Sequence, residues 1–101
     1  MWVWVFFDLP VTSKSEMKDA TLFRKNLVKD GFTMFQFSVY IRNCASRENA
    51  EVHVKRVKRF LPKNGMVTIL AVTDKQFGMM EVFESQSKAS IPQEGLQLEL
   101  F

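Results

Sequence analysis

The stretch that decides the fold is residues 2–10, WVWVFFDLP, in which an unbroken apolar run ends in a carboxylate and a proline. Such a run is typical of a strand in the middle of a sheet, where both faces are covered. Pro10 cannot continue the strand, so it ends close to Asp8. Asp8 is the only charged residue among the first thirteen. Because a carboxylate rarely lies beside so much apolar surface without a partner, Asp8 either has a local structural role or faces a cation or a reacting group.

The residues after this strand predict a helix and then a second strand. A Ser-x-x-Glu capping box begins at Ser13 and is followed by apolar residues at helical spacing, which predicts a helix over residues 14–30 that ends at Gly31. Residues 32–42 then alternate between apolar and polar side chains, the period of a half-covered strand. We expect this strand to break into two pieces near residues 35–36.

The second half of the chain predicts one more helix and several strands. The helix is expected over residues 47–61, followed by a nearly continuous apolar strand over residues 66–73 and a short strand over residues 77–83. Residues 85–95 are rich in Ser, Gln, Pro and Gly and have the composition of a flexible linker. Apolar and polar residues alternate again over residues 96–101, which predicts a terminal strand that pairs with a sheet edge of the dimer or of a partner.

The predicted order of elements is β-α-β-β-α-β with an additional C-terminal strand. This order is typical of a ferredoxin-like α+β fold, an antiparallel sheet with both helices on one face. We expect one domain over residues 1–84, with the linker and terminal strand over residues 85–101. The first strand is apolar on both faces, and two helices can cover only one of them. The other face would expose large side chains, so a face-to-face homodimer is predicted.

The composition restricts the classes of protein to which the chain can belong. The single cysteine, Cys44, excludes an internal disulfide and a cysteine-based zinc site. The first strand is too short to span a membrane and lacks the features of a signal peptide, so we expect a cytoplasmic protein with no membrane association. The net charge of +3 hides an asymmetry, because residues 1–73 carry twelve Lys or Arg against six Asp or Glu. This basic body is suited to contact with phosphate backbones.

Two sets of residues could carry a function. Asp8 alone would bind Mg²⁺ weakly, but a two-fold axis near the end of the first strand would bring two copies together in a geometry that suits metal-assisted phosphodiester hydrolysis. His53 and Cys44 have no partners that would complete a catalytic set, and we interpret both as structural. The second set is basic and falls within twenty-two positions. It consists of Arg42, Arg47, Lys55, Arg56, Lys58, Arg59 and Lys63. These residues form either a solvated helix face or a phosphate track for nucleic acid.

Several short motifs, in this order and spacing, resemble those of one family. They are FFDLP at residues 6–10, FRKNL at residues 23–27, QFSVY at residues 36–40, GMVTIL at residues 65–70 and TDKQF at residues 73–77. Over essentially its whole length the chain resembles the CRISPR-associated protein 2 family, the small homodimeric subunit of the spacer-acquisition complex in antiviral defence. These motifs are most similar to those of members from systems with a single large RNA-guided nuclease.

The resemblance implies a fold, partners and a metal. It implies a ferredoxin-like homodimer that bridges two dimers of the CRISPR-associated protein 1 integrase and holds the DNA to be inserted. It also implies that Asp8 matches the family's aspartate, the Mg²⁺ ligand and catalytic residue of an endonuclease acting on RNA or DNA. Phe7 stands where many members carry Tyr, and Met34 where some carry a basic residue. These two departures argue against strong intrinsic nuclease activity.

These features leave three candidate functions. The first is a Mg²⁺-dependent nuclease centred on paired Asp8 residues, and the second is an architectural dimer that binds DNA without catalysis. The third, a small-molecule regulatory domain of the same fold, would carry a glycine-rich ligand loop, whereas the four glycines of this chain are not clustered. The first two functions are compatible in one protein. We expect a subunit of the adaptation complex in which the architectural role dominates.

Overall fold

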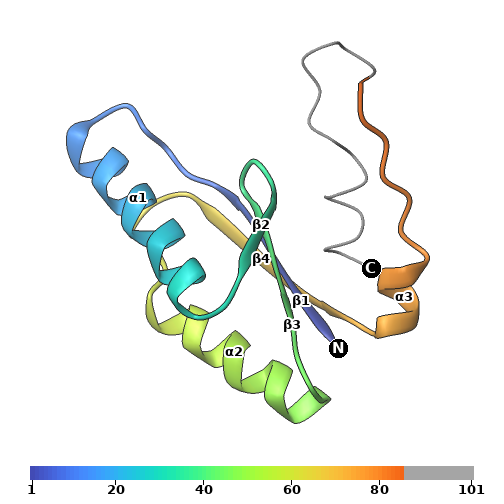
Figure 1. Cartoon of the computed structure of the whole chain (residues 1–101). Helices are drawn as coiled ribbons and strands as arrows, with labels where there is room; N and C mark the ends of the chain where they lie inside the picture. The colour runs from blue at the N-terminus through green and yellow to red at the C-terminus, as the bar shows by residue number, and fades with distance from the viewer. Residues whose placement is uncertain (86–101) are drawn as a thin grey trace.

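The structure, a computed structural model, describes residues 1–85 and has four antiparallel strands. The apolar stretch at the start of the chain forms β1 (Trp2–Asp8), which lies in the middle of the sheet, as predicted. It pairs on one side with β3 (Val39–Asn43) and on the other with β4 (Met66–Val72). The strand β2 (Thr33–Gln36) pairs with the outer edge of β3, giving the order β2-β3-β1-β4. This topology confirms the ferredoxin-like α+β fold (Figure 1).

Two helices lie against one face of this sheet (Figure 1). The first, α1 (Lys14–Lys29), begins at the predicted capping box, in which Ser13 accepts a hydrogen bond from the backbone N–H of Glu16 at 3.1 Å. It ends at Lys29, with Asp30 as the C-cap, and Gly31 follows with a φ of +92°, in the left-handed region that a residue with a side chain rarely adopts. The second helix, α2 (Arg47–Arg59), is two residues shorter than predicted. No helix among the described residues is long and apolar enough to cross a membrane.

The main core lies between the sheet and these two helices. Alternate residues of β1, namely Val3, Val5 and Phe7, point toward the helices and are buried. Phe23 of α1 packs edge-on against Phe7, with ring centroids 5.2 Å apart. Val57 of α2 is completely buried in the same cluster. The period of two in β1 and of 3.6 in the helices therefore brings one apolar face of each element together.

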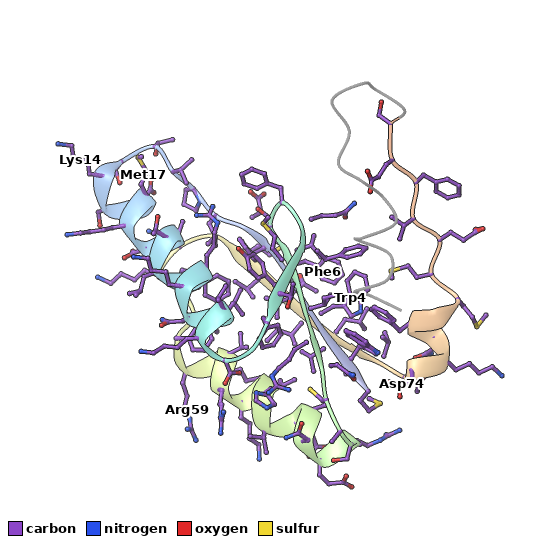
Figure 2. The ribbon with its side chains drawn as sticks, in the orientation of Figure 1. Trp4, Phe6, Lys14, Met17, Arg59 and Asp74 are labelled. Atoms are coloured by element: carbon purple, nitrogen blue, oxygen red, sulfur yellow. The ribbon has the colours of Figure 1, made fainter. Side chains whose placement is uncertain are left out.

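The opposite face of the sheet, which we call the open face, is only partly covered. It carries the other alternate residues of β1, including Trp4 and Phe6, which are half-buried. At one end the short helix α3 (Asp74–Gly78) lies across it, and the ring of Phe77 stacks on Trp2 with centroids 3.8 Å apart. Toward the other end Leu70 and Met66 of β4 are 49% and 69% exposed. Figure 2 shows Trp4 and Phe6 on the side of the sheet away from Lys14 and Arg59.

The structure differs from the sequence predictions at two places in the strands. Residues 32–42 break into two strands as predicted, but the break falls at residues 37–38, between β2 and β3, because Ser38 adopts a φ of +65° and turns the chain into a hairpin. The short strand expected over residues 77–83 does not form. Thr73 and Gln76 make a second capping box, which starts α3 where that strand was expected. The predicted terminal strand over residues 96–101 lies outside the described residues, as does nearly all of the linker.

Candidate functional site

Asp8 lies at the end of β1 and at the rim of the open face. It is the last residue of the strand, is exposed, and alternates with Trp4 and Phe6, so its side chain is on the open side. A shallow hollow of about 270 Å³ lies here, at the tip of the β2–β3 hairpin and the start of β4. Its lining residues are Phe6, Phe7, Asp8, Phe37, Ser38, Val39, Met66 and Thr68. The predicted carboxylate is thus accessible from solvent within a largely apolar surround.

Two turns hold the backbone on either side of Asp8. The backbone N–H of Phe7 donates to the carbonyl oxygen of Ser38 at 3.0 Å, which ties the hairpin tip to the end of β1. On the other side, Gly65 approaches so closely that a Cβ there would lie 2.6 Å from the carbonyl oxygen of Asp8. Gly65 also has a φ of +98°, so this position needs glycine for both space and backbone conformation. Two turns that are distant from Asp8 in the chain therefore hold its backbone in place.

The Asp8 carboxylate has no hydrogen bond or ion pair to residues 1–85, so no local structural role occupies it. Within the same residues, no three His, Cys, Asp or Glu side chains come together as a metal site. The described part of one chain therefore supplies a single carboxylate here. This fits Mg²⁺, which binds one or two carboxylates and otherwise keeps water or takes phosphate oxygens, but a lone carboxylate holds the ion weakly. A second copy of Asp8 would complete the donor set.

The seven basic residues singled out in the sequence do not act as one group. Arg42 is half-buried, and its Nε donates to the carbonyl oxygen of Asp30 at 2.8 Å while Nη1 donates to that of Asn43 at 2.8 Å. The guanidinium also lies close to Gly31, because a Cβ added at Gly31 would be only 2.9 Å from Nε of Arg42. Arg42 therefore joins the end of α1 to β3, and much of its hydrogen-bonding capacity is used within the fold.

The other six basic residues are exposed and lie on or just after α2. Arg56 and Arg59 line a hollow of about 330 Å³ between the two helices, together with Asn26, Lys29, Asp30 and Phe60. Lys55 and Lys58 lie on the exposed surface of α2, and Lys63 lies in the turn after it. Arg47 begins α2 and lines a different hollow beside Met1 and Glu51. The structure thus gathers the C-terminal half of α2 into a basic surface and leaves Arg47 apart from it.

A buried carboxylate connects the two helices beneath this surface. The Asp30 carboxylate, which is 9% exposed, lies 2.8 Å from Nδ1 of His53 and accepts a hydrogen bond from Nη1 of Arg56 at 3.0 Å. His53 is 4% exposed, as expected for a structural histidine. The pairing holds one arm of Arg56 against α1 and leaves the side chain half-exposed. Cys44 is also buried, in agreement with the structural role expected for it.

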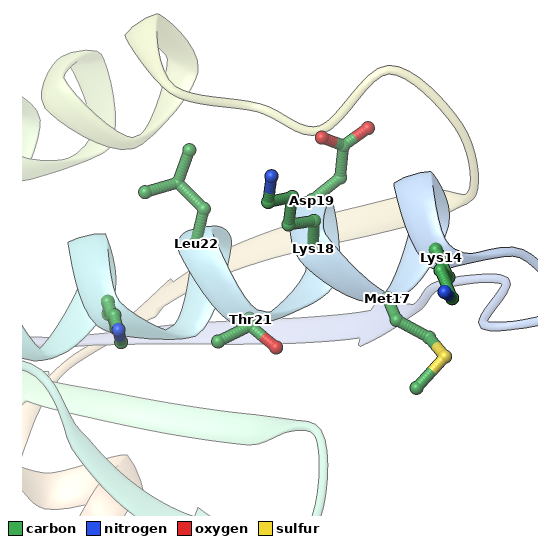
Figure 3. A pocket seen from close by; sticks show the side chains of 7 residues that line it. Lys14, Met17, Lys18, Asp19, Thr21 and Leu22 are labelled. Carbon is green, nitrogen blue, oxygen red and sulfur yellow. The ribbon is translucent and has the colours of Figure 1, made fainter.

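Sequence reasoning missed a row of lysines on α1. Lys14, Lys18, Lys25 and Lys29 are all exposed, and their spacing of four, seven and four residues places them along one side of the helix. The first three line a hollow of about 520 Å³ on the outer surface of α1, together with Met17, Thr21 and Leu22 (Figure 3). The spacing of the lysines was enough to predict this row from the sequence, because the apolar Phe23 and Leu27 lie on the opposite side of the same helix.

Comparisons with known proteins point to one family. The model of the family described as CRISPR-associated protein Cas2 matches residues 1–80. A relative from Flavobacterium psychrophilum is 54% identical over 101 residues, which cover 100% of this chain and 88% of that protein. One from Parvibaculum lavamentivorans is 48% identical over the full length of both chains, and one from Paracidovorax avenae is 42% identical over 100% of this chain and 94% of that protein. All three are named CRISPR-associated endoribonuclease Cas2.

Proposed function

The chain belongs to the Cas2 family of CRISPR-associated proteins, and we propose that it is a homodimeric, nucleic-acid-binding subunit of CRISPR spacer acquisition with a Mg²⁺-dependent nuclease site at Asp8. The observation that carries the nuclease proposal is the placement of Asp8, an exposed and unpaired carboxylate among residues 1–85, fixed by two turns at the rim of the open face. The relatives' shared name, endoribonuclease, agrees with a phosphodiester substrate.

The homodimer is proposed from the open face. Trp4 and Phe6 are only half-buried there, and Leu70 of β4 lies opposite Trp4 in the sheet register. Contiguous apolar surface of this kind is seldom left in water by a soluble protein. A second copy offers the same surface, and a two-fold interface is the commonest way for such a surface to be covered. Because Asp8 lies at the rim of this face, the two copies of Asp8 would come to one side of the dimer.

The chemistry that Asp8 supports is hydrolysis of a phosphodiester. When bound, Mg²⁺ supplies a polarised water and neutralises charge on the phosphate. Asp8 would hold the ion and orient its water shell, and its copy in the second protomer would strengthen the site. In the reaction a water oxygen attacks phosphorus and the sugar oxygen leaves, so one P–O bond forms and one breaks.

The architectural function is the second candidate, and the basic surface of α2 favours it. Lys55, Arg56, Lys58 and Arg59 follow one another within five positions and are exposed, so they could contact a DNA backbone while the dimer bridges two dimers of the CRISPR-associated protein 1 integrase. The outer edge of β4 is unpaired within residues 1–85. It is a suitable acceptor for the terminal strand predicted over residues 96–101 of the second protomer or for a strand of the integrase.

Two variants separate the nuclease from the architectural role. Asp8→Asn keeps the size of the side chain but removes its charge, so it should abolish Mg²⁺-dependent cleavage of RNA or duplex DNA while DNA binding and integration with the partner survive. Reversing Lys55, Arg56, Lys58 and Arg59 to Glu should abolish binding and integration. Cleavage, DNA affinity and integration are measured on the same folded dimers. Loss of integration in Asp8→Asn would show that catalysis is needed for acquisition, and unchanged cleavage would remove Asp8 from the site.

A further inference from the structure

The exposed ring of Phe37 is a feature that the proposed functions leave unused. Phe37 lies in the turn between β2 and β3, and its side chain is 84% exposed although it lines the same hollow as Asp8. The ring makes no stacked or edge-on contact with another aromatic ring among residues 1–85. Its faces are therefore accessible to a ligand that enters the hollow.

The backbone holds this ring beside the Asp8 carboxylate. Ser38, the next residue after Phe37, has a φ of +65°, a left-handed conformation that costs free energy in a residue with a side chain. The Ser38 carbonyl oxygen accepts a hydrogen bond from the backbone N–H of Phe7 at 3.0 Å. Because Phe7 directly precedes Asp8, this bond joins the neighbour of Phe37 to the neighbour of Asp8. The sheet therefore sets where Phe37 begins relative to the carboxylate.

The hollow offers no positive charge that could hold a phosphate. Among the described residues that line it, Asp8 is the one charged residue, and the others carry aromatic, aliphatic, thioether or hydroxyl side chains. A strand that reaches Asp8 therefore gains no ion pair from the side chains of this hollow. A nucleobase can gain affinity there, because every base has a π face that stacks on an aromatic ring.

We propose that Phe37 stacks on a nucleobase next to the phosphodiester that is cleaved at Asp8, and so places that phosphodiester at the carboxylate. This inference rests on the proposed nuclease function. A base inside a duplex is covered by its neighbours, so the strand must present an unpaired base to the ring. The basic surface of α2 lies on the other side of the sheet, where Figure 2 shows Arg59 away from Trp4 and Phe6. Phe37 thus adds a contact to a base that the basic surface does not supply.

The first test compares three substitutions of Phe37 in the full-length chain. Phe37→Ala removes the side chain, Phe37→Leu keeps apolar bulk without a π face, and Phe37→Tyr keeps the ring. In Mg²⁺-dependent cleavage of single-stranded RNA, we expect Phe37→Ala and Phe37→Leu to raise KM on the order of 10-fold. The value of kcat should change little, because the stack is made equally in the ground state and the transition state. Phe37→Tyr should keep the KM of the unmodified chain.

A second measurement needs neither metal nor cleavage. A single-stranded RNA that carries iodouracil crosslinks under ultraviolet light to an aromatic ring stacked on that base, and mass spectrometry locates the crosslinked residue. We expect a crosslink at Phe37 in the unmodified chain and none at that position in Phe37→Leu. Phe83 is the matched control, because it is also 84% exposed but does not line the hollow. It should form no crosslink, and Phe83→Ala should leave KM unchanged.

The outcomes separate this inference from the proposed function. If the unmodified chain cleaves RNA but Phe37→Leu keeps the same KM and no crosslink forms at Phe37, the inference is overturned and the nuclease stands. If the chain cleaves no RNA or DNA but crosslinks at Phe37, the stacking stands and the nuclease fails. Absence of both cleavage and crosslink contradicts both. Sedimentation of Phe37→Leu is the last check, since a dimer weakened as much as KM is raised would make Phe37 an interface residue and overturn the inference.

Discussion

The two faces of one sheet differ in both covering and charge. On one face, Val3, Val5 and Phe7 are buried beneath two helices whose outer surfaces are rich in Lys and Arg. On the open face, alternate residues of the same strand remain half-buried, and among residues 1–85 Asp8 is the only charged residue that the strands place there. One strand with a period of two can thus serve a core and an interaction surface together. The sheet also separates the proposed functions, with DNA on the helix layer and a carboxylate pair on the open side.

The largest expected effect is on the covered face. Phe23 is 1% exposed and packs against Phe7 and Phe60, so Phe23→Ala removes a ring and leaves a cavity. We expect the free energy of unfolding to fall by about 3–5 kcal/mol. Chemical denaturation followed by circular dichroism measures it. The matched control is Phe37→Ala, at a hairpin tip where the ring is 84% exposed, which should change stability by less than about 0.5 kcal/mol. Similar losses in both variants would contradict the assignment of the core.

The next effect contrasts the open face with the helix layer. Leu70 on the open face and Met17 on α1 are 49% and 53% exposed, so a Glu introduced at either position would be about equally exposed to solvent in the single chain. A charge placed in the proposed dimer interface is desolvated, and Leu70→Glu should weaken the dimer by about 2–3 kcal/mol, on the order of 100-fold in the dissociation constant. Sedimentation across a concentration series measures the constant. Met17→Glu should leave it unchanged. Equal behaviour of the two variants would argue against the open face as the interface.

A smaller effect is expected where the two helices join. Asp30→Asn keeps the size of the side chain but removes the negative charge that His53 and Arg56 contact. The Asn oxygen can accept a hydrogen bond from one of these two side chains, while its amide hydrogens would point at the donor of the other. We expect a loss of about 1–3 kcal/mol in the free energy of unfolding, because a buried donor is left without a good acceptor. Thermal and chemical denaturation give the value. Asp19→Asn, on the same helix and with no ion pair among the described residues, is the control and should be nearly neutral.

The smallest effect is a pH dependence at the start of α1. The hydrogen bond from the Thr12 hydroxyl, followed by those from the backbones of Thr12 and Ser13, holds the pKa of Glu16 below its ordinary value. A carboxyl with a lowered pKa in the folded state stabilises the fold above its unfolded pKa, and the contribution is lost as pH falls through the folded pKa. Stability should therefore decline from about pH 5 toward pH 3, and Glu16→Gln should decline less over that interval. Denaturation midpoints across pH measure the difference, and parallel curves would exclude a role for Glu16.

Most of the fold could be predicted because its signals are local. The apolar run of β1, the capping box at Ser13 and the glycine at position 31 each specify one element through neighbours in sequence. The errors arose where a local signal was overlooked or competed with another. At Thr73 a capping box outweighed the apolar residues that suggested a strand, and at Ser38 a left-handed residue made the hairpin two positions later than expected.

The candidate site was only partly predictable for the same reason. Asp8 follows from the sequence, because a lone carboxylate after a buried apolar run is a local feature. The roles of the arginines do not, because Arg42 and Arg56 both contact Asp30 across separations of 12 and 26 residues. Only packing decides which of them is held in the fold and which remains half-exposed. The spacing of the lysines on α1 could have predicted their row from the sequence. That Lys29 lies beside Arg56 and Arg59 of α2 is shown only by the packing of the two helices.

Local sequence signals were enough to specify β1, α1, α2 and β4, their order, and the acid at the end of β1. These properties depend on periodicity and on caps, which act over a few residues. Only the tertiary structure decided that α3 covers one end of the open face, that Asp30 joins the two helices, and that the basic residues of α1 and α2 meet in one hollow. Each of these arrangements depends on distances between residues far apart in the chain, and such distances are set when the helices and the sheet pack against a common core.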